Sequence, residues 1–428
     1  MDLTKKNVLI FPAGSEIGIE VFNSLKYTHH FELFGASGKS DHASYMYRES
    51  HYFESDFYID DVKFVERFNE LLTRWNIQFV IPTHDSISYF LATVRHKINA
   101  EIITSSEQAN KVARFKNITY DVFKQYDFCP KVFNFTQELD YPVYLKPTDS
   151  QGGKGNCLIR NEIELSSYTE LADTSVLCEF LPGKEYSVDC FTDFKGNLLF
   201  SGPRTRKRIH IGISFRSESV PLTEDIRNIA NAINSELKPN GSWFFQIKQD
   251  VNGKWKLLEV ATRQASTMAV YRANGINFAL LSLFNAQEIP TSILNNNNAV
   301  SLDRYLGNRF KLAVEYTKIY IDLDETLIAD SMVNPQIMAY LYQEKNAGKF
   351  IVLITKHKYN LTQTLNELAI SEKLFDQIIH LQDSENKVDF IKPDNAIFID
   401  NYFLDRLNVS EKLKIPVFDV DAVECLIK

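Results

Sequence analysis

The chain has 428 residues, and at about 150 residues per domain this length suggests two or three domains. Hydrophobic residues make up 44% of the sequence and charged residues 24%, a composition that excludes a largely disordered protein. Lys and Arg number 47 against 55 Asp and Glu, so the formal charge is −8. This acidic balance argues against a nucleic-acid partner, because nucleic-acid-binding proteins need a basic face.

The five cysteines and the distribution of apolar residues indicate where the protein resides. The cysteines contain no CxxC pair, and their number is odd. No stretch approaches the ~20 apolar residues that a membrane span needs. We therefore expect a cytoplasmic protein with reduced thiols and no membrane partner.

Residues 8–85 alternate short apolar runs with amphipathic segments. The runs VLIFPAG, FELFGAS and FVIPTHD predict buried strands of a parallel, doubly wound α/β sheet. Gly14 and Gly18 lie at the first strand-to-helix turn, but the full GxGxxG pattern is absent. A plain tight turn is therefore favoured over a nucleotide site there.

After about residue 130 the strand-like runs come in pairs. The segments DFKGN and DVNGK place glycine beside polar residues between two such runs, which is typical of a hairpin, so this region is predicted to be antiparallel and α+β. The polar stretch LNNNNA at 294–299 suits a linker or a surface loop. From Lys318 onward, apolar runs alternate with helical segments again, which predicts a further parallel α/β unit.

The segment 141–160 carries the first candidate site. A strand ends at Lys146, and a loop with Gly152, Gly153 and Gly155 follows, in which backbone N–H groups could close over phosphates. A polar hairpin loop explains the same residues equally well. Further along, the DVNGK hairpin brings Gln246 and Glu259 onto adjacent strands, where facing oxygens can hold a Mg²⁺ ion that bridges nucleotide phosphates.

From Val8 to about residue 290 the chain resembles the ATP-grasp superfamily, particularly the carbamoyl-phosphate-synthase-like carboxylate–amine ligases. The resemblance includes PTHD at 82–85 and the segment FKNITYDVFKQYDFCP. It implies a Rossmann-like pre-ATP-grasp domain at 1–110 and an ATP-grasp domain at 111–293. It also implies ATP and Mg²⁺, with these roles: Lys116, Lys146 and the 149–155 loop on the phosphates, Glu179 and the backbone near Leu181 at the adenine, Glu185 at the ribose, Gln246 and Glu259 on the metal, and Arg263 at the γ-phosphate.

One position departs from the family pattern. The family usually has E-x-N-P-R, whereas this chain has EVATR with Ala261, so one metal ligand is missing. The implied reaction joins a small-molecule or glycan-linked carboxylate to an amine through an acyl phosphate, in an enzyme that is often a homodimer. The departure leaves open a phosphotransferase or a non-catalytic nucleotide sensor.

The segment GPRTRKR lies between the two strand pairs. It holds four cations, and two interpretations stay open: a solvated basic turn, or a binding site for a carboxylate substrate or the γ-phosphate. These cations are Arg204, Arg206, Lys207 and Arg208.

The last third places Asp322 and Asp324 just beyond a buried strand. Two carboxylates so close repel each other unless a cation lies between them. Thr355 at a strand tip, then Lys387, and Asp400 at another strand tip follow in order.

After a linker at 294–315, residues 316–428 thus resemble the haloacid-dehalogenase (HAD) phosphatases, a Rossmannoid fold that here has a minimal cap. The resemblance implies a phosphorylated substrate and the following roles: Asp322 as nucleophile, Asp324 as general acid/base, Thr355 and Lys387 on the phosphate, Asp322, Asp324 and Asp400 at Mg²⁺, and Asp405 assisting.

Overall fold

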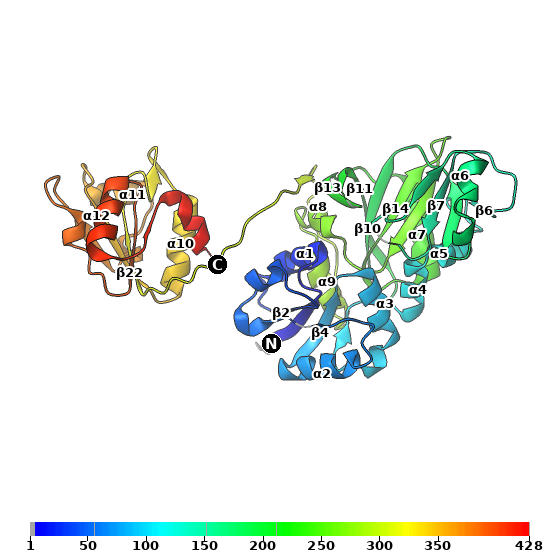
Figure 1. Cartoon of the computed structure of the whole chain (residues 1–428), viewed down its shortest axis with the longest axis horizontal. Helices are drawn as coiled ribbons and strands as arrows, with labels where there is room; N and C mark the ends of the chain where they lie inside the picture. The colour runs from blue at the N-terminus through cyan, green and yellow to red at the C-terminus, as the bar shows by residue number, and fades with distance from the viewer. Residues whose placement is uncertain (1–4, 55, 151, 211, 428) are drawn as a thin grey trace. The chain divides into compact units, whose positions relative to one another are not determined.

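The computed structural model describes residues 5–54, 56–150, 152–210 and 212–427. The chain divides into two compact units, Met1–Leu306 and Gly307–Lys428, which are described separately below (Figure 1). None of the helices in this described part has the length and apolar character that crossing a membrane requires.

The first unit begins with a five-stranded parallel sheet of order β3-β2-β1-β4-β5, which confirms the predicted parallel pairing. Its strands are β1 (Lys6–Phe11), β2 (Phe31–Ser37), β3 (Tyr52–Glu54), β4 (Ile77–Pro82) and β5 (Glu101–Ile102). The helices that follow these strands are α1 (Glu16–Leu25), α2 (Phe64–Arg74), α3 (Asp85–Thr93) and α4 (Glu107–Arg114).

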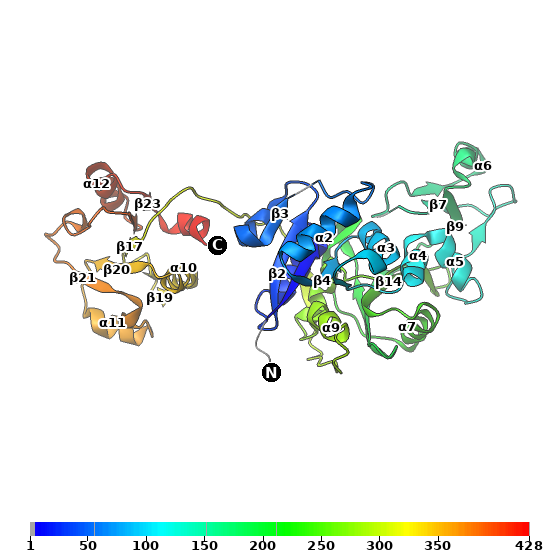
Figure 2. The same ribbon diagram turned by 90° about the horizontal axis from the view of Figure 1, so that it is seen from below.

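Both faces of this sheet are covered, because side chains alternate along each strand. Leu9 and Phe11 of β1 pack against Phe64 and Phe68 of α2. Val8 on the opposite face packs against α1 and α9 (Phe278–Asn285), and Figure 2 shows α2 and α9 on either side of the strands. The carboxyl ends of β1 and β4 therefore lie at one edge, where the candidate site begins.

Two four-stranded antiparallel sheets form much of the ATP-binding region predicted from the sequence. The smaller, of order β6-β9-β7-β8, contains β6 (Val132–Phe133), β7 (Val143–Pro147), β8 (Cys157–Ile159) and β9 (Ser175–Glu179). The larger, of order β11-β10-β14-β15, contains β10 (Glu185–Thr192), β11 (Leu198–Thr205), β14 (Gly241–Gln249) and β15 (Trp255–Ala261). Helices α5 (Lys116–Phe123), α6 (Glu162–Ser166), α7 (Glu224–Leu237) and α8 (Ala269–Arg272) complete this region. The DFKGN and DVNGK turns join β10 to β11 and β14 to β15, as predicted.

The interval 294–315, predicted to be a linker, is not uniform. Its Asn-rich part is tied to the end of α8, since Asn296 N donates to Asn274 O at 2.9 Å. The next strand, β16 (Ser301–Asp303), extends the hairpin of β12 (Lys207–His210) and β13 (Ile213–Glu218) into a three-stranded sheet. The Asn-rich part and β16 therefore contact the first unit, which extends to Leu306, and the second unit starts only at Gly307.

The second unit is a five-stranded parallel sheet of order β21-β20-β17-β22-β23, which confirms the predicted parallel α/β arrangement. Its strands are β17 (Lys318–Ile321), β20 (Phe350–Thr355), β21 (Gln377–His380), β22 (Ala396–Ile399) and β23 (Val417–Phe418). Its helices are α10 (Pro335–Asn346), α11 (Leu361–Glu367) and α12 (Phe403–Leu413), and the short hairpin β18 (Ile328–Ala329) and β19 (Met332–Val333) precedes α10.

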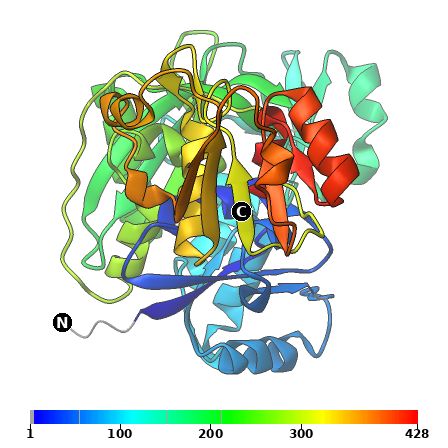
Figure 3. The ribbon, with the colours of Figure 1, turned by 90° about the vertical axis from the view of Figure 1, so that its left-hand side faces the viewer.

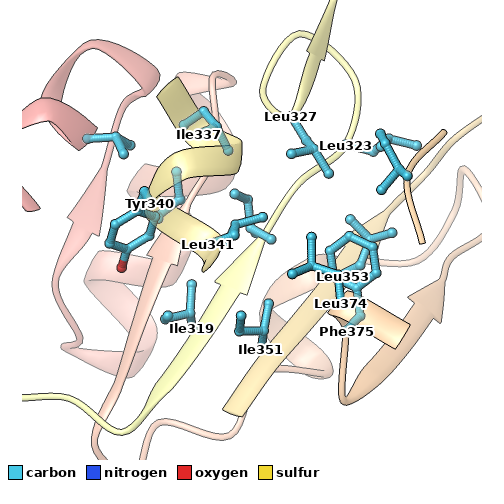
Figure 4. Close-up of a cluster of buried hydrophobic side chains, with 14 of the residues drawn as sticks. Ile319, Leu323, Leu327, Ile337, Tyr340, Leu341, Ile351, Leu353, Leu374 and Phe375 are labelled. Carbon is cyan, nitrogen blue, oxygen red and sulfur yellow. The ribbon is translucent and has the colours of Figure 1, made fainter. Parts of the chain in front are cut away.

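Helices lie on both faces of this second sheet (Figures 1 and 3). Figure 4 shows Ile337 and Leu341 of α10 directed toward Ile319 and Ile351 of the two central strands. Val409 of α12 packs on the opposite face. The strands whose tips carry the predicted HAD residues are thereby packed by hydrophobic side chains on both faces.

Candidate functional site

The first unit encloses a cavity of about 650 Å³, lined by the loops after β1 and β4, by α5, by the β7–β8 loop and by strands β10, β14 and β15. It gathers most of the predicted ATP residues: Lys116, Lys146, Gly152, Gly153, Glu179, Leu181, Glu185, Gln246, Glu259 and Arg263. The predicted cover of this cavity, the 149–155 loop, includes Gln151, which lies outside the described residues.

Gly155 is not among the residues that line the cavity. Its φ is +78°, and a Cβ there would lie 2.9 Å from the ring of Pro147. A glycine at position 155 is therefore required by the conformation of the β7–β8 turn and not by contact with the cavity.

Two buried lysines form the cationic wall of the cavity. Lys146 Nζ donates to the hydroxyl of Tyr120 at 3.0 Å, and that hydroxyl donates to Leu258 O at 2.9 Å. Burial opposes the charge of Lys146, but Tyr120, Cys178 and Glu259 outweigh it, so the pKa of Lys146 is raised. Burial lowers the pKa of Lys116, whose ammonium donates to Ser150 O at 2.6 Å and so anchors the β7–β8 loop.

Gln246 and Glu259 are direct partners in the β14–β15 register, so their side chains leave the same face of the sheet. Both line the cavity. Ala261, where the family pattern has asparagine, is buried two residues further along β15 and offers no oxygen from its side chain. The pair thus provides two oxygen donors at this end of the cavity.

The cavity lining also includes two glutamates, each already engaged by protein groups. Glu179 Oε1 accepts from Lys131 N at 2.8 Å. Glu185 lies between two cations, 3.1 Å from Arg206 Nε and 3.4 Å from Lys248 Nζ. Leu181 between them is buried, so this part of the lining offers an apolar surface beside two acceptors.

The basic segment GPRTRKR divides into inward and outward cations. Arg204 is buried and forms a bidentate pair with Asp189, at 2.7 and 2.9 Å, and Arg206 donates to Gly212 O at 2.9 Å beside Glu185. Both line the cavity. Lys207 and Arg208 point outward and pair with acidic residues of the surface, Glu218 and Asp303. Lys207 and Arg208 thus match the interpretation as a solvated basic turn, whereas Arg204 and Arg206 lie where the interpretation as an anion-binding site requires.

Arg263 is held by a residue that the sequence offered only within the PTHD pattern. Its NH2 donates to Asp85 Oδ2 at 2.6 Å. Burial would raise the pKa of Asp85, but the charge of Arg263 and its hydrogen bond lower it. Asp85 begins α3 after β4, so this ion pair joins the parallel sheet to the end of β15. Tyr120 is a second residue that sequence reasoning missed, because a tyrosine on a helix carries no signal for a lysine partner 26 residues away.

In the second unit, one lysine lies among three carboxylates at the carboxyl ends of the strands. Lys387 Nζ is 2.6 Å from Asp400 Oδ2, 2.9 Å from Asp322 Oδ1 and 3.4 Å from Asp405 Oδ2. Burial raises the pKa of Asp322 to about 6, against the opposing effect of Lys387. The Oγ1 of Thr355 is buried and makes no hydrogen bond with the described residues.

The Asp324 side chain does not join this cluster, and its predicted role as a metal ligand beside Asp322 and Asp400 stays a prediction. Its carboxylate instead lies 2.9 and 3.0 Å from Nδ1 of His357. Among the residues that the structure describes, no group of three or more His, Cys, Asp or Glu side chains is arranged to hold a metal ion. His357, two residues after Thr355, was missed because a lone histidine in a loop carries no sequence signal.

Comparisons with known proteins agree with the architecture of the first unit. The family described as "ATP-grasp in the biosynthetic pathway with Ter operon" matches residues 172–302, from before β9 through most of β16. A search of curated proteins found no match.

Solved structures show the same fold at low sequence identity. One is the biotin carboxylase domain dimer of 2-oxoglutarate carboxylase from Hydrogenobacter thermophilus with MgADP, ADP and bicarbonate, at 18% identity and a TM-score of 0.54 over 66% of this chain and 69% of that one. A second is L-amino acid ligase from Bacillus licheniformis, at 17% identity and a TM-score of 0.53 over 67% of this chain and 75% of that one. A third is N5-carboxyaminoimidazole synthetase from Staphylococcus aureus with ADP, at 16% identity and a TM-score of 0.56 over 69% of this chain and 82% of that one. These likenesses show that the chain contains an ATP-grasp fold.

Proposed function

We propose that the first unit is an ATP-dependent carboxylate–amine ligase and that the second is a Mg²⁺-dependent phosphatase of the HAD type. The observation that carries the first part is the convergence of Lys116, Lys146, Gln246, Glu259 and Arg263 on one cavity of an ATP-grasp fold. The strand order β3-β2-β1-β4-β5 supports a Rossmann-like pre-ATP-grasp domain before it.

Different residues of the cavity would bind different parts of the nucleotide. Lys116 and Lys146 would bind phosphate oxygens, with the loop of Gly152 and Gly153 closing over them. The apolar surface at Leu181 would take the adenine, and Glu185 the ribose hydroxyls. In the proposed reaction a substrate carboxylate oxygen attacks the γ-phosphorus of ATP, and the bond to the bridging oxygen breaks to give ADP and an acyl phosphate. An amine nitrogen then attacks the carbonyl carbon, the carbon–oxygen bond to phosphate breaks, and the amine loses a proton.

Mg²⁺ fits the oxygen donors of both units. Mg²⁺ is usually held by one or two protein carboxylates together with water and substrate phosphates, so a larger protein cluster is not required. Gln246 and Glu259 supply such a pair in the cavity. In the second unit the donors are the neighbouring carboxylates of Asp322 and Asp400, which share Lys387 as their cation. When bound, the ion would neutralise phosphate charge at each site.

Ala261 favours a second candidate reaction for the first unit. With one metal ligand fewer, the cavity would hold the acyl phosphate or another phosphoryl product less tightly for attack by an amine. A phosphotransferase that releases a phosphorylated product is the outcome this substitution favours. Detection of phosphorylated product with no amine incorporated would support it.

The phosphatase proposal rests on the order and placement of side chains at the strand tips of the second unit. Asp322 follows β17, Thr355 ends β20 and Asp400 follows β22, so parallel neighbours bring all three to one edge. Asp322 would attack the substrate phosphorus, while Thr355 and Lys387 bind the phosphoryl oxygens. Between β17 and β20 the described chain forms only a short hairpin and α10, so the edge carries a minimal cap.

Single variants of the full chain separate the two activities. Lys146→Met should abolish ATP-dependent ADP release in a screen of amino acids and sugar acids, whereas Lys195→Met, on an exposed turn, should not. Asp322→Asn should abolish only the release of phosphate from phosphomonoesters, and Asp383→Asn, an exposed residue of the same unit, should leave it unchanged. Phosphatase turnover that survives Asp322→Asn would refute the second assignment, and ADP release that survives Lys146→Met would refute the first.

A further inference from the structure

Asp324 and His357 come from neighbouring strands of the second sheet. Asp324 follows β17 and His357 follows β20, and these two strands pair in parallel. Their loops therefore emerge side by side at the edge that carries Asp322 and Thr355. The two side chains meet there although 33 residues separate them.

The imidazole is fixed on both of its nitrogens. Nδ1 lies 2.9 Å from Oδ1 and 3.0 Å from Oδ2 of Asp324, and Nε2 lies 2.8 Å from the Oγ1 of Thr364 in α11. The His357 carbonyl also accepts from Nε2 of His380 at 2.7 Å, which holds the loop itself. The His357 side chain is only 5% exposed, so its orientation is set by these contacts and by packing.

The Asp324 carboxylate is partly exposed, so burial does not force it to pair with His357. The Asp324 side chain is 48% exposed, and water could satisfy its oxygens. His357 is its sole hydrogen-bonding or ion-pairing partner within the described ranges, since Lys387 reaches Asp322, Asp400 and Asp405 instead. A buried donor that spans both oxygens of an exposed carboxylate fixes the plane and direction of that carboxylate.

We propose that His357 is a positioning residue that aims Asp324 at the leaving-group oxygen of the phosphatase substrate, an inference that rests on the phosphatase function proposed above. In the first step, an oxygen of Asp322 bonds to phosphorus, the bond from phosphorus to the leaving oxygen breaks, and the proton of Asp324 passes to that oxygen. In the second step, Asp324 takes a proton from water, the water oxygen bonds to phosphorus, and the bond from phosphorus to Asp322 breaks. Both steps need Asp324 in a defined direction.

The dependence on the leaving group tests this role in the full-length protein. An alkyl phosphate requires protonation of its leaving oxygen, whereas 4-nitrophenyl phosphate departs as a stabilised phenolate. His357→Ala should therefore lower kcat/KM for glycerol phosphate on the order of 10²-fold, the usual contribution of a general acid. For 4-nitrophenyl phosphate, kcat/KM should stay near that of the unchanged protein. His357→Asn, which keeps an N–H near the position of Nδ1, should restore most of the alkyl activity.

Two further variants make the outcomes distinguishable. Thr364→Val removes the partner of Nε2 and should reproduce the selective loss on the alkyl substrate in weaker form. An equal loss on both substrates in His357→Ala, with no rescue by asparagine, would overturn the proposal and make the histidine structural. If instead Asp322→Asn retains activity on both substrates, the phosphatase assignment itself fails, whatever the histidine variants show.

Discussion

Replacing Gly212 by alanine tests whether two loops must touch for the nucleotide to bind. Gly212 lies in the turn between β12 and β13, and a Cβ at this position would lie 2.2 Å from the Cα of Gly152 in the β7–β8 loop. Cβ atoms are not found closer than 3.0 Å to such neighbours, so the loops must part by at least 3.0 − 2.2 = 0.8 Å. Arg206 donates to Gly212 O at 2.9 Å, so the displacement also disturbs the cation beside Glu185.

The expected loss of affinity follows from this displacement. A shift of nearly 1 Å would break one or two hydrogen bonds from the loop to the phosphates, at about 0.5–1.5 kcal/mol each. We therefore expect the Kd for MgADP, measured by calorimetry, to rise about tenfold, which corresponds to about 1.4 kcal/mol.

Gly253→Ala is the matched control. Gly253 has a φ of +77° against +72° at Gly212, but nothing lies within 4 Å of its added Cβ. Both variants should lose about 1–2 kcal/mol of stability, the cost of the left-handed backbone for alanine. Gly212→Ala should lose more than this, because its Cβ also clashes with the backbone of Gly152. Only Gly212→Ala should lose affinity for MgADP. Equal Kd values in the two variants would refute a role of the loop contact in nucleotide binding.

Three other changes have defined outcomes. Tyr120→Phe removes the hydroxyl that accepts from Lys146 and should weaken MgADP binding several-fold at a cost of about 0.5–1.5 kcal/mol in stability, read by calorimetry and thermal unfolding. Arg204→Met leaves Asp189 buried without its cation, which should cost about 3–5 kcal/mol. Burial raises the pKa of Asp189, so the folded protein favours the protonated carboxyl and the loss of stability should shrink as pH falls. Thermal midpoints at acid and alkaline pH check this sign. Adding Asp189→Asn to Arg204→Met should restore stability. Chelation by EDTA should abolish phosphate release from 4-nitrophenyl phosphate, added Mg²⁺ should restore it, and activity that persists in EDTA would contradict the metal assignment.

Much of the architecture could be predicted because its signals are local. The DVNGK turn fixes the hairpin of β14 and β15, and this alone places Gln246 opposite Glu259. The apolar runs that end at Lys146, Thr355 and Asp400 likewise predict strand tips, since a buried parallel strand is a short apolar run that stops where the chain becomes polar.

The remaining features depend on contacts between distant segments. Strand β16 has three residues after an Asn-rich loop, and only its pairing with β13, more than eighty residues earlier, makes it a strand. In GPRTRKR, the positive φ of +46° at Arg208 interrupts the alternation of side chains, so inward and outward cations cannot be assigned from composition. Tyr120 and His357 lie far along the chain from their partners Lys146 and Asp324, and the sequence around them contains no pattern that predicts these contacts.

The charge arrangement of the second unit also constrains how a phosphate could enter it. Lys387 is shared by Asp322, Asp400 and Asp405, which leaves an excess of carboxylates over cations in a buried place. Burial raises the pKa of both Asp322 and Asp400, which shows that the site resists further negative charge. A phosphoryl group brings more of it, and one ammonium already engaged by three carboxylates cannot offset it. The described residues provide no second cation within ion-pair distance of these three carboxylates. In the proposed phosphatase, the substrate would therefore need to arrive with a divalent ion such as Mg²⁺.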